Sequence, residues 1–415
     1  MKIYLLLALR NLRRNLRRTL LTISGMAAGF AVLLWLTCIL KGTNQQIVDD
    51  VTSTQVGHLQ VWRTEYLEDP LLSFTFTPKM EEVRRLLPAG SLTAERIFLP
   101  ALISSGEQSV PISLTGIDPA SEAQVTQILA SKVEGEYLSS QPDPDCTERE
   151  IYLSRALAGL LKVGLGDKVV VLAQAADGTL GNELLRVRGM FDTGSRAYDR
   201  SVAFASLSCV RKIGAVTGDH EIVVKLPSNV SIATAQLALQ KGIGDIGDGL
   251  KLTTWREAVP PLAGMVSFNE ATLLLISLVL FGVTAFGVVN TLLMSVFERT
   301  REFGVMLALG VTPTGVCALI LIEAALIGVL AAVIGTILGV LVVSYHFHAG
   351  FDLRPFLGTD FVVNQFKLTT LVHPIFSFDR YFVLIGATMF FATIAGLIPA
   401  LHAAKMNVVE AIRHR

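Results

Sequence analysis

The sequence contains few charged residues and few cysteines. Only 17% of its 415 residues are charged and 51% are hydrophobic, which is too apolar for an ordinary soluble protein. Its 35 basic and 35 acidic residues give no net charge, so no nucleic-acid partner is expected. The four cysteines are too few for a disulfide framework. These shortages exclude a small disulfide-rich domain and favour a membrane protein.

Sequence motifs for catalysis are missing as well. The chain has no G-x-x-x-x-G-K-[ST] phosphate loop, so it is not expected to bind ATP as P-loop proteins do. It also lacks zinc-ligand spacing and a serine or cysteine nucleophile motif, and His346, His348 and His373 are interpreted as surface histidines. We therefore expect no enzymatic activity, no metal site and no cofactor in this chain, and any energy must come from a partner.

The hydrophobic residues are concentrated in four blocks. Each block is long enough to cross a hydrocarbon core about 30 Å thick. The first is predicted to be a retained signal anchor, because no small-residue cleavage site ends it convincingly. The long stretch 41–269 between the first two blocks has the composition of a water-soluble domain. The blocks are residues 19–40, 273–297, 316–345 and 381–401.

Residues 1–18 are predicted to form an amphipathic helix in the headgroup layer. Its apolar face follows helical spacing through Leu5, Leu9, Leu12 and Leu16. The other side carries five candidate membrane anchors, Arg10, Arg13, Arg14, Arg17 and Arg18. Because basic residues beside a span mark the cytoplasmic side, the N-terminus is predicted to lie inside. Counting spans then places 41–269 and 346–380 outside, and 298–313 and the basic tail 402–415 inside.

The fold class that follows is a membrane protein with four transmembrane helices and a large α+β extracytoplasmic domain between the first two. In that domain, a middle subdomain of about 119–217 is expected to be inserted into an outer one. Cys146 and Cys209 both lie in the extracytoplasmic domain, where they either form one disulfide or remain two free thiols. The expected strands are 57–62, 99–103, 108–116, 168–173, 184–190, 201–204 and 221–226. The expected helices are 78–87, 154–161 and 232–241.

A short charged segment separates the second and third spans. It must lie on the water side, because a charge at mid-bilayer costs several kcal/mol. Helical spacing places Phe303, Met306 and Leu307 on one face, which predicts a short helix on the membrane surface. We interpret this segment as the place where a separate motor protein contacts the chain. The candidate coupling residues are Glu298, Arg299, Arg301, Glu302, Phe303, Gly304, Leu309 and Gly310.

The third span carries three glycines and one carboxyl group. Gly328, Gly335 and Gly339 let helices approach closely in lipid, either within the chain or between two chains. Glu323 lies about 10 Å into the span, at 1.5 Å per residue. Such a carboxyl is either functional or paired. No second ionisable residue is expected at its depth, so a hydrogen bond to a neighbouring span is the alternative to a functional role.

Several of these segments together resemble one family, the FtsX-like ABC transporter permeases, which include MacB exporters and lipoprotein-releasing Lol-type permeases. The resemblance covers essentially the whole chain. At the N-terminus it rests on ALRNLRRN at 8–15, and after the second span on ERTREFG at 298–304. At the C-terminus it rests on PALHAAK at 399–405 and EAIR at 410–413.

The resemblance implies a mechanism and partners. A separate dimer of ABC ATPase subunits would bind ATP and Mg²⁺, and its closure would push on residues 298–310 in a bacterial inner membrane. A second permease subunit, identical or different, would complete the transporter. Three functions remain open: release of lipoproteins from the membrane, MacB-like export with a periplasmic adaptor, and FtsX-like regulation of a cell-wall hydrolase without transport.

Overall fold

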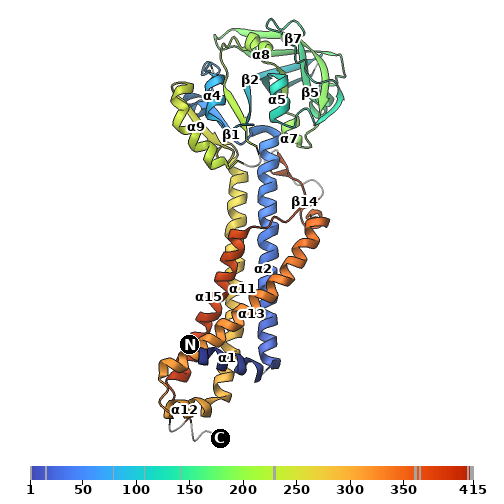
Figure 1. Ribbon diagram of the computed structural model, residues 1–415. Helices are drawn as coiled ribbons and strands as arrows, with labels where there is room; N and C mark the ends of the chain where they lie inside the picture. Colours follow the sequence, from blue (N-terminus) through green and yellow to red (C-terminus); the bar gives the residue numbers. More distant parts are fainter. Residues whose placement is uncertain are drawn as a thin grey trace. The chain divides into compact units, whose positions relative to one another are not determined.

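The chain folds into two units (Figure 1). The computed structural model describes residues 2–14, 16–77, 79–106, 108–141, 143–227, 230–358, 362–363, 366–408 and 411. The helical unit comprises Met1–Gln45, Ser267–Pro355 and Leu371–Arg415, and the sheet domain comprises Gln46–Val266 and Phe356–Thr370. Of the positions singled out above, Asn15 and the tail 412–415 lie outside the described residues, as does the side chain of Arg13.

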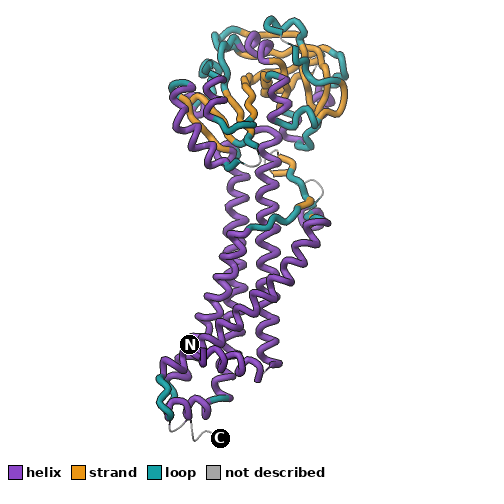
Figure 2. Tube along the Cα trace, in the orientation of Figure 1, coloured by secondary structure: helices purple, strands orange, loops and turns teal. Residues whose placement is uncertain are grey.

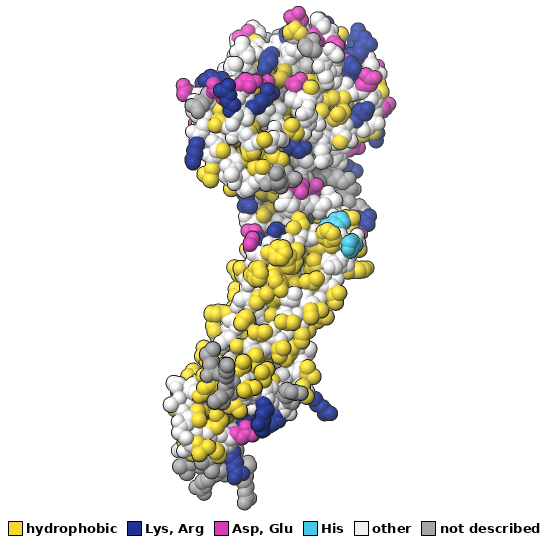
Figure 3. All heavy atoms as spheres, viewed as in Figure 1, with side chains coloured by type: hydrophobic (Ala, Val, Ile, Leu, Met, Phe, Trp, Pro, Cys, Tyr) yellow, Lys and Arg dark blue, Asp and Glu magenta, His cyan; other side chains and the backbone are white. Residues whose placement is uncertain are grey.

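Four helices of the described chain, α2, α11, α13 and α15, are long and apolar enough to cross a membrane, and the four apolar blocks lie within them. The helices that lie in or enter the helical unit are α1 (Lys2–Arg14), α2 (Leu16–Val51), α11 (Pro260–Glu298), α12 (Thr300–Ala308), α13 (Pro313–Ala349), α14 (Arg354–Leu357) and α15 (Phe378–Ala404). Its short strands are β11 (Phe351–Asp352) and β14 (Leu371–Val372). Hydrophobic side chains cover the visible face of the long helices (Figure 3). Phe286 is 75% exposed and Leu341 63%, as expected of side chains that face lipid.

The glycines of α13 pack against other helices of the same chain. A Cβ atom on Gly335 would lie 2.8 Å from the carbonyl oxygen of Ala27 in α2, which is closer than real Cβ atoms come. One on Gly339 would lie 2.9 Å from Leu34 of the same helix. Gly328 instead faces α15. Of the two alternatives left open by the sequence, packing within the chain accounts for all three glycines.

The sheet domain is built on one mixed sheet (Figure 2). Among the described residues ten strands pair in the order β10-β1-β9-β2-β3-β8-β5-β7-β4, with β6 against β2 and β7. The strands are β1 (Leu59–Arg63), β2 (Leu92–Ser105), β3 (Gln108–Ile117), β4 (Lys132–Gly135), β5 (Glu150–Ser154), β6 (Lys168–Gln174), β7 (Leu180–Phe191), β8 (Val202–Ser206), β9 (Glu221–Lys225) and β10 (Leu250–Thr254), and β12 (Val362–Val363) pairs separately with β13 (Phe366–Lys367). The helices are η1 (Thr52–Val56), α3 (Thr64–Glu68), α4 (Met80–Leu86), α5 (Pro119–Val125), α6 (Arg155–Leu161), α7 (Arg196–Asp199), α8 (Leu207–Gly214), α9 (Ile232–Ile246) and α10 (Trp255–Ala258).

The sheet runs without a break through the expected middle subdomain. Every expected strand overlaps an observed one, and the β6–β7 hairpin turns near Asp177-Gly178 as its sequence indicates. The strands β4, β5 and β10 were not expected. The hydrophobic side chains nevertheless form separate cores: one draws on residues between 97 and 216, and another on residues 59–87 and 222–252. The first core takes residues from both sides of the expected boundary near 119, such as Leu99 and Leu153, so the expected subdomain does not coincide with one core.

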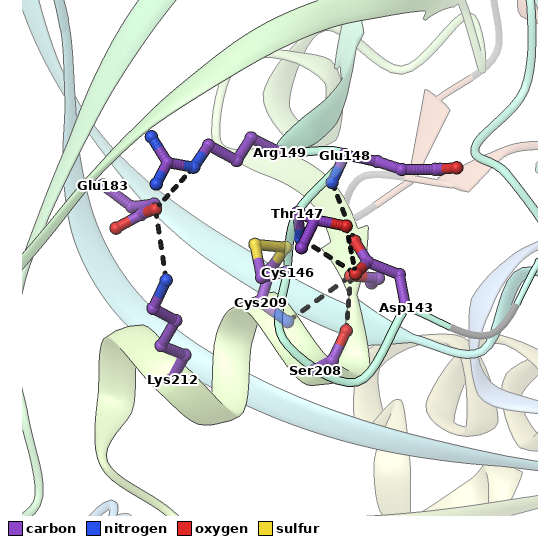
Figure 4. Close-up of a disulfide and its surroundings, with 10 residues drawn as sticks. Asp143, Cys146, Thr147, Glu148, Arg149, Glu183, Ser208, Cys209 and Lys212 are labelled. Carbon is purple, nitrogen blue, oxygen red and sulfur yellow. Dashed lines mark hydrogen bonds and ion pairs between the residues drawn. A yellow bond between two sulfur atoms is a disulfide. The ribbon is translucent and has the colours of Figure 1, made fainter.

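A disulfide joins Cys146 to Cys209 and settles the alternative that the sequence left open (Figure 4). Cys209 lies in α8, and Cys146 lies in the loop before β5. Asp143 shapes that loop, because its carboxylate accepts hydrogen bonds from the backbone N–H groups of Thr147 (2.8 Å) and Glu148 (2.9 Å). The disulfide attaches the loop between β4 and β5 to the hydrophobic core that draws on residues between 97 and 216.

Thiol counting tests this disulfide. Alkylation of the denatured, unreduced chain is expected to label two cysteines, Cys38 and Cys317, and alkylation after reduction to label all four, as measured by mass spectrometry. Because a disulfide restricts the unfolded chain, Cys209→Ala is expected to lower the free energy of unfolding by about 2–5 kcal/mol. The same variant should expose Cys146 as one additional reactive thiol. Labelling of four thiols before reduction would show that the bridge is absent.

Candidate coupling site

Helix α12 and its connections form the segment that the sequence marks for coupling. The turn after α12 contains Gly310, whose φ of +92° is strained for any residue with a side chain. Thr312 then caps α13 by accepting a hydrogen bond from the N–H of Gly315 (3.2 Å), and Pro313 occupies the first turn of that helix. The sequence therefore ends one helix and starts the next within four residues, which keeps α12 close to the spans on both sides.

The apolar face of α12 is covered by the chain itself. Phe303 is 1% exposed, and Met306 and Leu307 pack against the same cluster of buried side chains, which includes Val296 and Leu319. This corrects the expectation that these three residues dip into lipid as a surface helix. The physical reason is that neighbouring helices supply enough apolar surface to bury them.

A buried ion pair joins this segment to the third span. Arg299 is 6% exposed and Glu323 3%, and the Nη1 of Arg299 donates to the Oε1 of Glu323 over 3.0 Å. The guanidinium also lies 4.9 Å from the ring centroid of Phe303, a cation–π distance. The expectation that no ionisable residue lies at the depth of Glu323 was wrong. Arg299 reaches Glu323 from the position directly before α12.

Two residues of α1 join these contacts into a ring that closes through the backbone of α1. Glu302 accepts hydrogen bonds from Arg299 (3.0 Å) and from Arg14 of α1 (2.5 Å). Asn11, one turn earlier on α1, donates to Glu323. The ring Arg14–Glu302–Arg299–Glu323–Asn11, called the coupling ring below, links α1, α12 and α13 and contains two positive and two negative charges. Its formal charge is therefore zero, and of its four charged residues Arg299 and Glu323 are buried, whereas Arg14 and Glu302 are exposed.

A second contact lies beside the coupling ring. Arg18, near the start of α2, pairs with Glu298 at the end of α11 over 2.8 Å. The hydroxyl groups of Thr22 and Thr291 meet 2.6 Å apart between the same two helices. Both glutamates of the predicted coupling segment thus contact an arginine from the N-terminal part of the chain, so Arg14 and Arg18 do more than face the headgroups.

The structure sorts the remaining candidates by exposure. Arg299, Phe303 and Gly304 are buried and offer no surface to a partner. Glu298, Arg301, Glu302, Leu309 and Gly310 are exposed, and so are the membrane-anchor candidates Arg10 and Arg17. The sequence reasoning missed Val305 and Ala308, which share the exposed face of α12 with Arg301 because they follow it by four and seven residues. It also missed Asn11, for which no local pattern gives a signal.

A double-mutant cycle tests the buried pair. Arg299→Leu or Glu323→Leu alone leaves one charge buried without its partner, so each is expected to lower the free energy of unfolding by about 3–5 kcal/mol. The double variant is expected to lose much less than the sum, as measured by unfolding in detergent. Asp352→Ala provides the control, since Arg354 and Asp352 form an exposed pair at 2.7 Å whose loss should cost below about 1 kcal/mol. Additive losses at 299 and 323 would argue against the pair.

Acid should weaken the coupling ring through Glu302. Burial opposes its ionisation, but the hydrogen bonds from Arg14 and Arg299 prevail and lower the pKa of Glu302 below its ordinary 4.5. The ionised carboxylate therefore stabilises the fold above about pH 4.5, and this contribution disappears as the pH falls through the lowered pKa. Since Glu302 is half exposed, the loss is expected to be about 1 kcal/mol or less. Thermal unfolding between pH 7 and pH 4 should show a smaller decline for Glu302→Gln than for the unmodified chain, and parallel declines would contradict this assignment.

Two family models match this chain. Residues 19–241 match the MacB-like periplasmic core domain, and residues 274–408 match the FtsX-like permease C-terminal domain. The lipoprotein-releasing system transmembrane protein LolC of Xylella fastidiosa is 22% identical over 95% of this chain and 93% of its own. LolC of Neisseria meningitidis is equally similar, over 95% and 94%.

Exporters with a fused ATP-binding part are matched over a smaller share of their length. The macrolide export ATP-binding/permease protein MacB of Shewanella oneidensis is 23% identical over 95% of this chain but only 58% of its own. A solved structure of the periplasmic region of MacB from Actinobacillus actinomycetemcomitans aligns with 52% of this chain and 96% of its own, at 14% identity and a TM-score of 0.37. The chain belongs to the FtsX-like permeases with a MacB-like periplasmic core domain, and it is a multi-pass inner-membrane ABC transporter permease.

Proposed function

We propose that this chain is the permease subunit through which a separate ABC ATPase, which binds ATP and Mg²⁺, drives the release of lipoproteins from the inner membrane. The observation that carries the proposal is the match to LolC, which covers more than nine-tenths of both chains. The MacB relatives, whose names include an ATP-binding part, extend well beyond this chain. The transporter would also contain a second permease subunit.

The exposed face of α12 is the proposed ATPase contact. Leu309 is 81% exposed and Val305 43%, and the charged Arg301 lies beside them. Arginine is enriched among the residues that dominate binding at protein interfaces, and exposed apolar neighbours such as Leu309 add surface that a partner can bury. Behind this face, the coupling ring fastens α12 to α1 and α13, so a push on α12 would move all three helices together. The chain continues into the sheet domain within α2 and α11, which are helical across the boundaries at 45/46 and 266/267.

The proposed topology places both termini and α12 in the cytoplasm and the sheet domain outside. The support is the arginine-rich α1, since basic residues beside a span mark the cytoplasmic side. The coupling ring brings α1 and α12 together, so the two segments would lie on the same side of the membrane. A side chain at 309 labelled from the periplasm would contradict this topology.

Co-purification of the ATPase tests the proposed contact. The tagged chain is expected to retain its ATPase, and Leu309→Glu is expected to reduce the amount retained roughly tenfold or more, as for a central interface anchor. Leu237→Glu is the matched control, because Leu237 is 63% exposed on α9 in the sheet domain. Equal retention by both variants would remove α12 from the ATPase contact.

Reconstitution tests the cargo. Proteoliposomes that contain the purified complex and an acyl-labelled lipoprotein are expected to release the lipoprotein when ATP and Mg²⁺ are supplied, and the Leu309→Glu complex should release little. ATP-dependent efflux of a macrolide without lipoprotein release would replace this function with export of the MacB type. If ATP hydrolysis moves neither cargo, the lipoprotein proposal fails.

A further inference from the structure

The sheet domain contains a cavity of about 340 Å³ on one face of the sheet. This volume lies at the lower end of the range of about 300–1,000 Å³ found for small-molecule sites. The strands β1, β2, β3, β8 and β9 provide its floor, and α5 and η1 contribute to its rim. The opposite face of the same strands is an ordinary core that contains Val61, Leu99, Leu114 and Ile222. One side of the sheet thus holds apolar packing, and the other holds polar and aromatic side chains around a space.

The strand register places a carboxylate in the middle of this floor. Glu221 on β9 pairs across the sheet with Trp62 on β1 and with Arg96 on β2. Phe98 lies next to this row on β2 and stacks on Trp62 with ring centroids 5.7 Å apart. Cross-strand neighbours lie about 5 Å apart on the same face. The buried carboxylate of Glu221 therefore lies beside the aromatic side chains of Trp62 and Phe98.

The negative charge of the Glu221 carboxylate is only weakly neutralised by neighbouring side chains. Its side chain is 3% exposed, and among the described residues its carboxylate receives one hydrogen bond, from Arg96 Nη1 at 3.4 Å. The same guanidinium is already engaged by Glu122 through two bonds of 2.6 and 3.0 Å, and by the carbonyl oxygen of Gln55 at 2.5 Å. These hydrogen bonds attach α5 and η1 to the sheet, and Glu221 takes part in none of them.

The charges around the cavity favour a cation. Arg96 contributes one positive charge to the lining, and Glu122, Glu221 and Glu257 contribute three negative charges, which leaves two negative charges in excess. Burial raises the pKa of Glu221 to about 7, although Arg96 opposes the shift. An anion would meet a guanidinium whose donors are occupied. A cation would meet an available carboxylate and aromatic faces, and such faces attract ammonium groups.

We propose that this cavity binds a small organic amine whose ammonium group pairs with Glu221 and whose apolar body lies against Trp62, Phe98 and Phe204. Phe204 is 4% exposed and closes the row that begins at Phe98. The cavity volume limits the amine to a small molecule. The site is separate from the coupling ring, because all of its residues belong to the sheet domain.

Calorimetric titration of the full-length protein in nanodiscs, without ATPase, tests this site. The probes are propylamine, phenethylamine and 4-phenylbutylamine, with 3-phenylpropionate and 2-phenylethanol as an anionic and a neutral comparison. At least one amine is expected to bind at one site per chain, roughly tenfold or more tightly than either comparison compound, because a charge-assisted hydrogen bond is involved. Saturation by none of the amines, or equal binding of all three classes, would overturn the proposal.

Variants separate the site from a general effect on folding. Glu221→Gln keeps the shape of the side chain and is expected to weaken amine binding roughly tenfold or more. Glu95→Gln is the matched control, since Glu95 lies on the same strand as Arg96 but points to the other face of the sheet. Ser113→Phe narrows the cavity without changing its charge and should also weaken binding. Unchanged affinity in both Glu221→Gln and Ser113→Phe would contradict the proposed site, whatever the outcome of the ATPase and lipoprotein experiments.

Discussion

The buried contact between Arg299 and Glu323 is the interaction on which the arrangement of the helical unit depends. A single charge at this depth would be costly, and two opposite charges 3.0 Å apart remove most of that cost. The pair also fixes direction, because Arg299 stands at the start of α12 and Glu323 within α13. Through Glu302 and Asn11 the same pair reaches α1. Three helices that could otherwise slide along apolar surfaces are held in one register by polar contacts.

The spans and most strands could be predicted because their signals are local. Apolar runs longer than about 20 residues indicate spans wherever they occur, and alternation of polar and apolar residues indicates strands such as β1. Strand β4 gave no such signal, since Lys132 and its neighbours are exposed on both faces. The inserted subdomain was expected from breaks in the sequence pattern, but cross-strand pairing such as that of β3 with β8 joins the two parts into one sheet.

The coupling ring could be predicted only in part. The charged residues between the second and third spans stand out in an apolar chain, and so does Glu323. Which arginine meets which glutamate depends on contacts between residues 280 or more positions apart, as for Arg14 with Glu302 and Arg18 with Glu298. The hydrophobic periodicity of the sequence carries no information about which distant residues pair. The buried position of Phe303 was missed for the same reason, because a helix with one apolar face packs equally well against lipid or against other helices.

The coupling ring combines a strong contact with a weak one, as expected of a connection that can open in part. Its buried part, Arg299 with Glu323, gains strength from exclusion of water, whereas Arg14 and Glu302 lie half exposed, where an ion pair contributes little. Breaking the outer contact therefore costs far less free energy than breaking the inner one. If the contact between Arg14 and Glu302 breaks, Asn11 still joins α1 to Glu323 of α13. In the proposed function, a push on α12 would therefore reach α13 through Arg299 and Glu323, and α1 would move with α13.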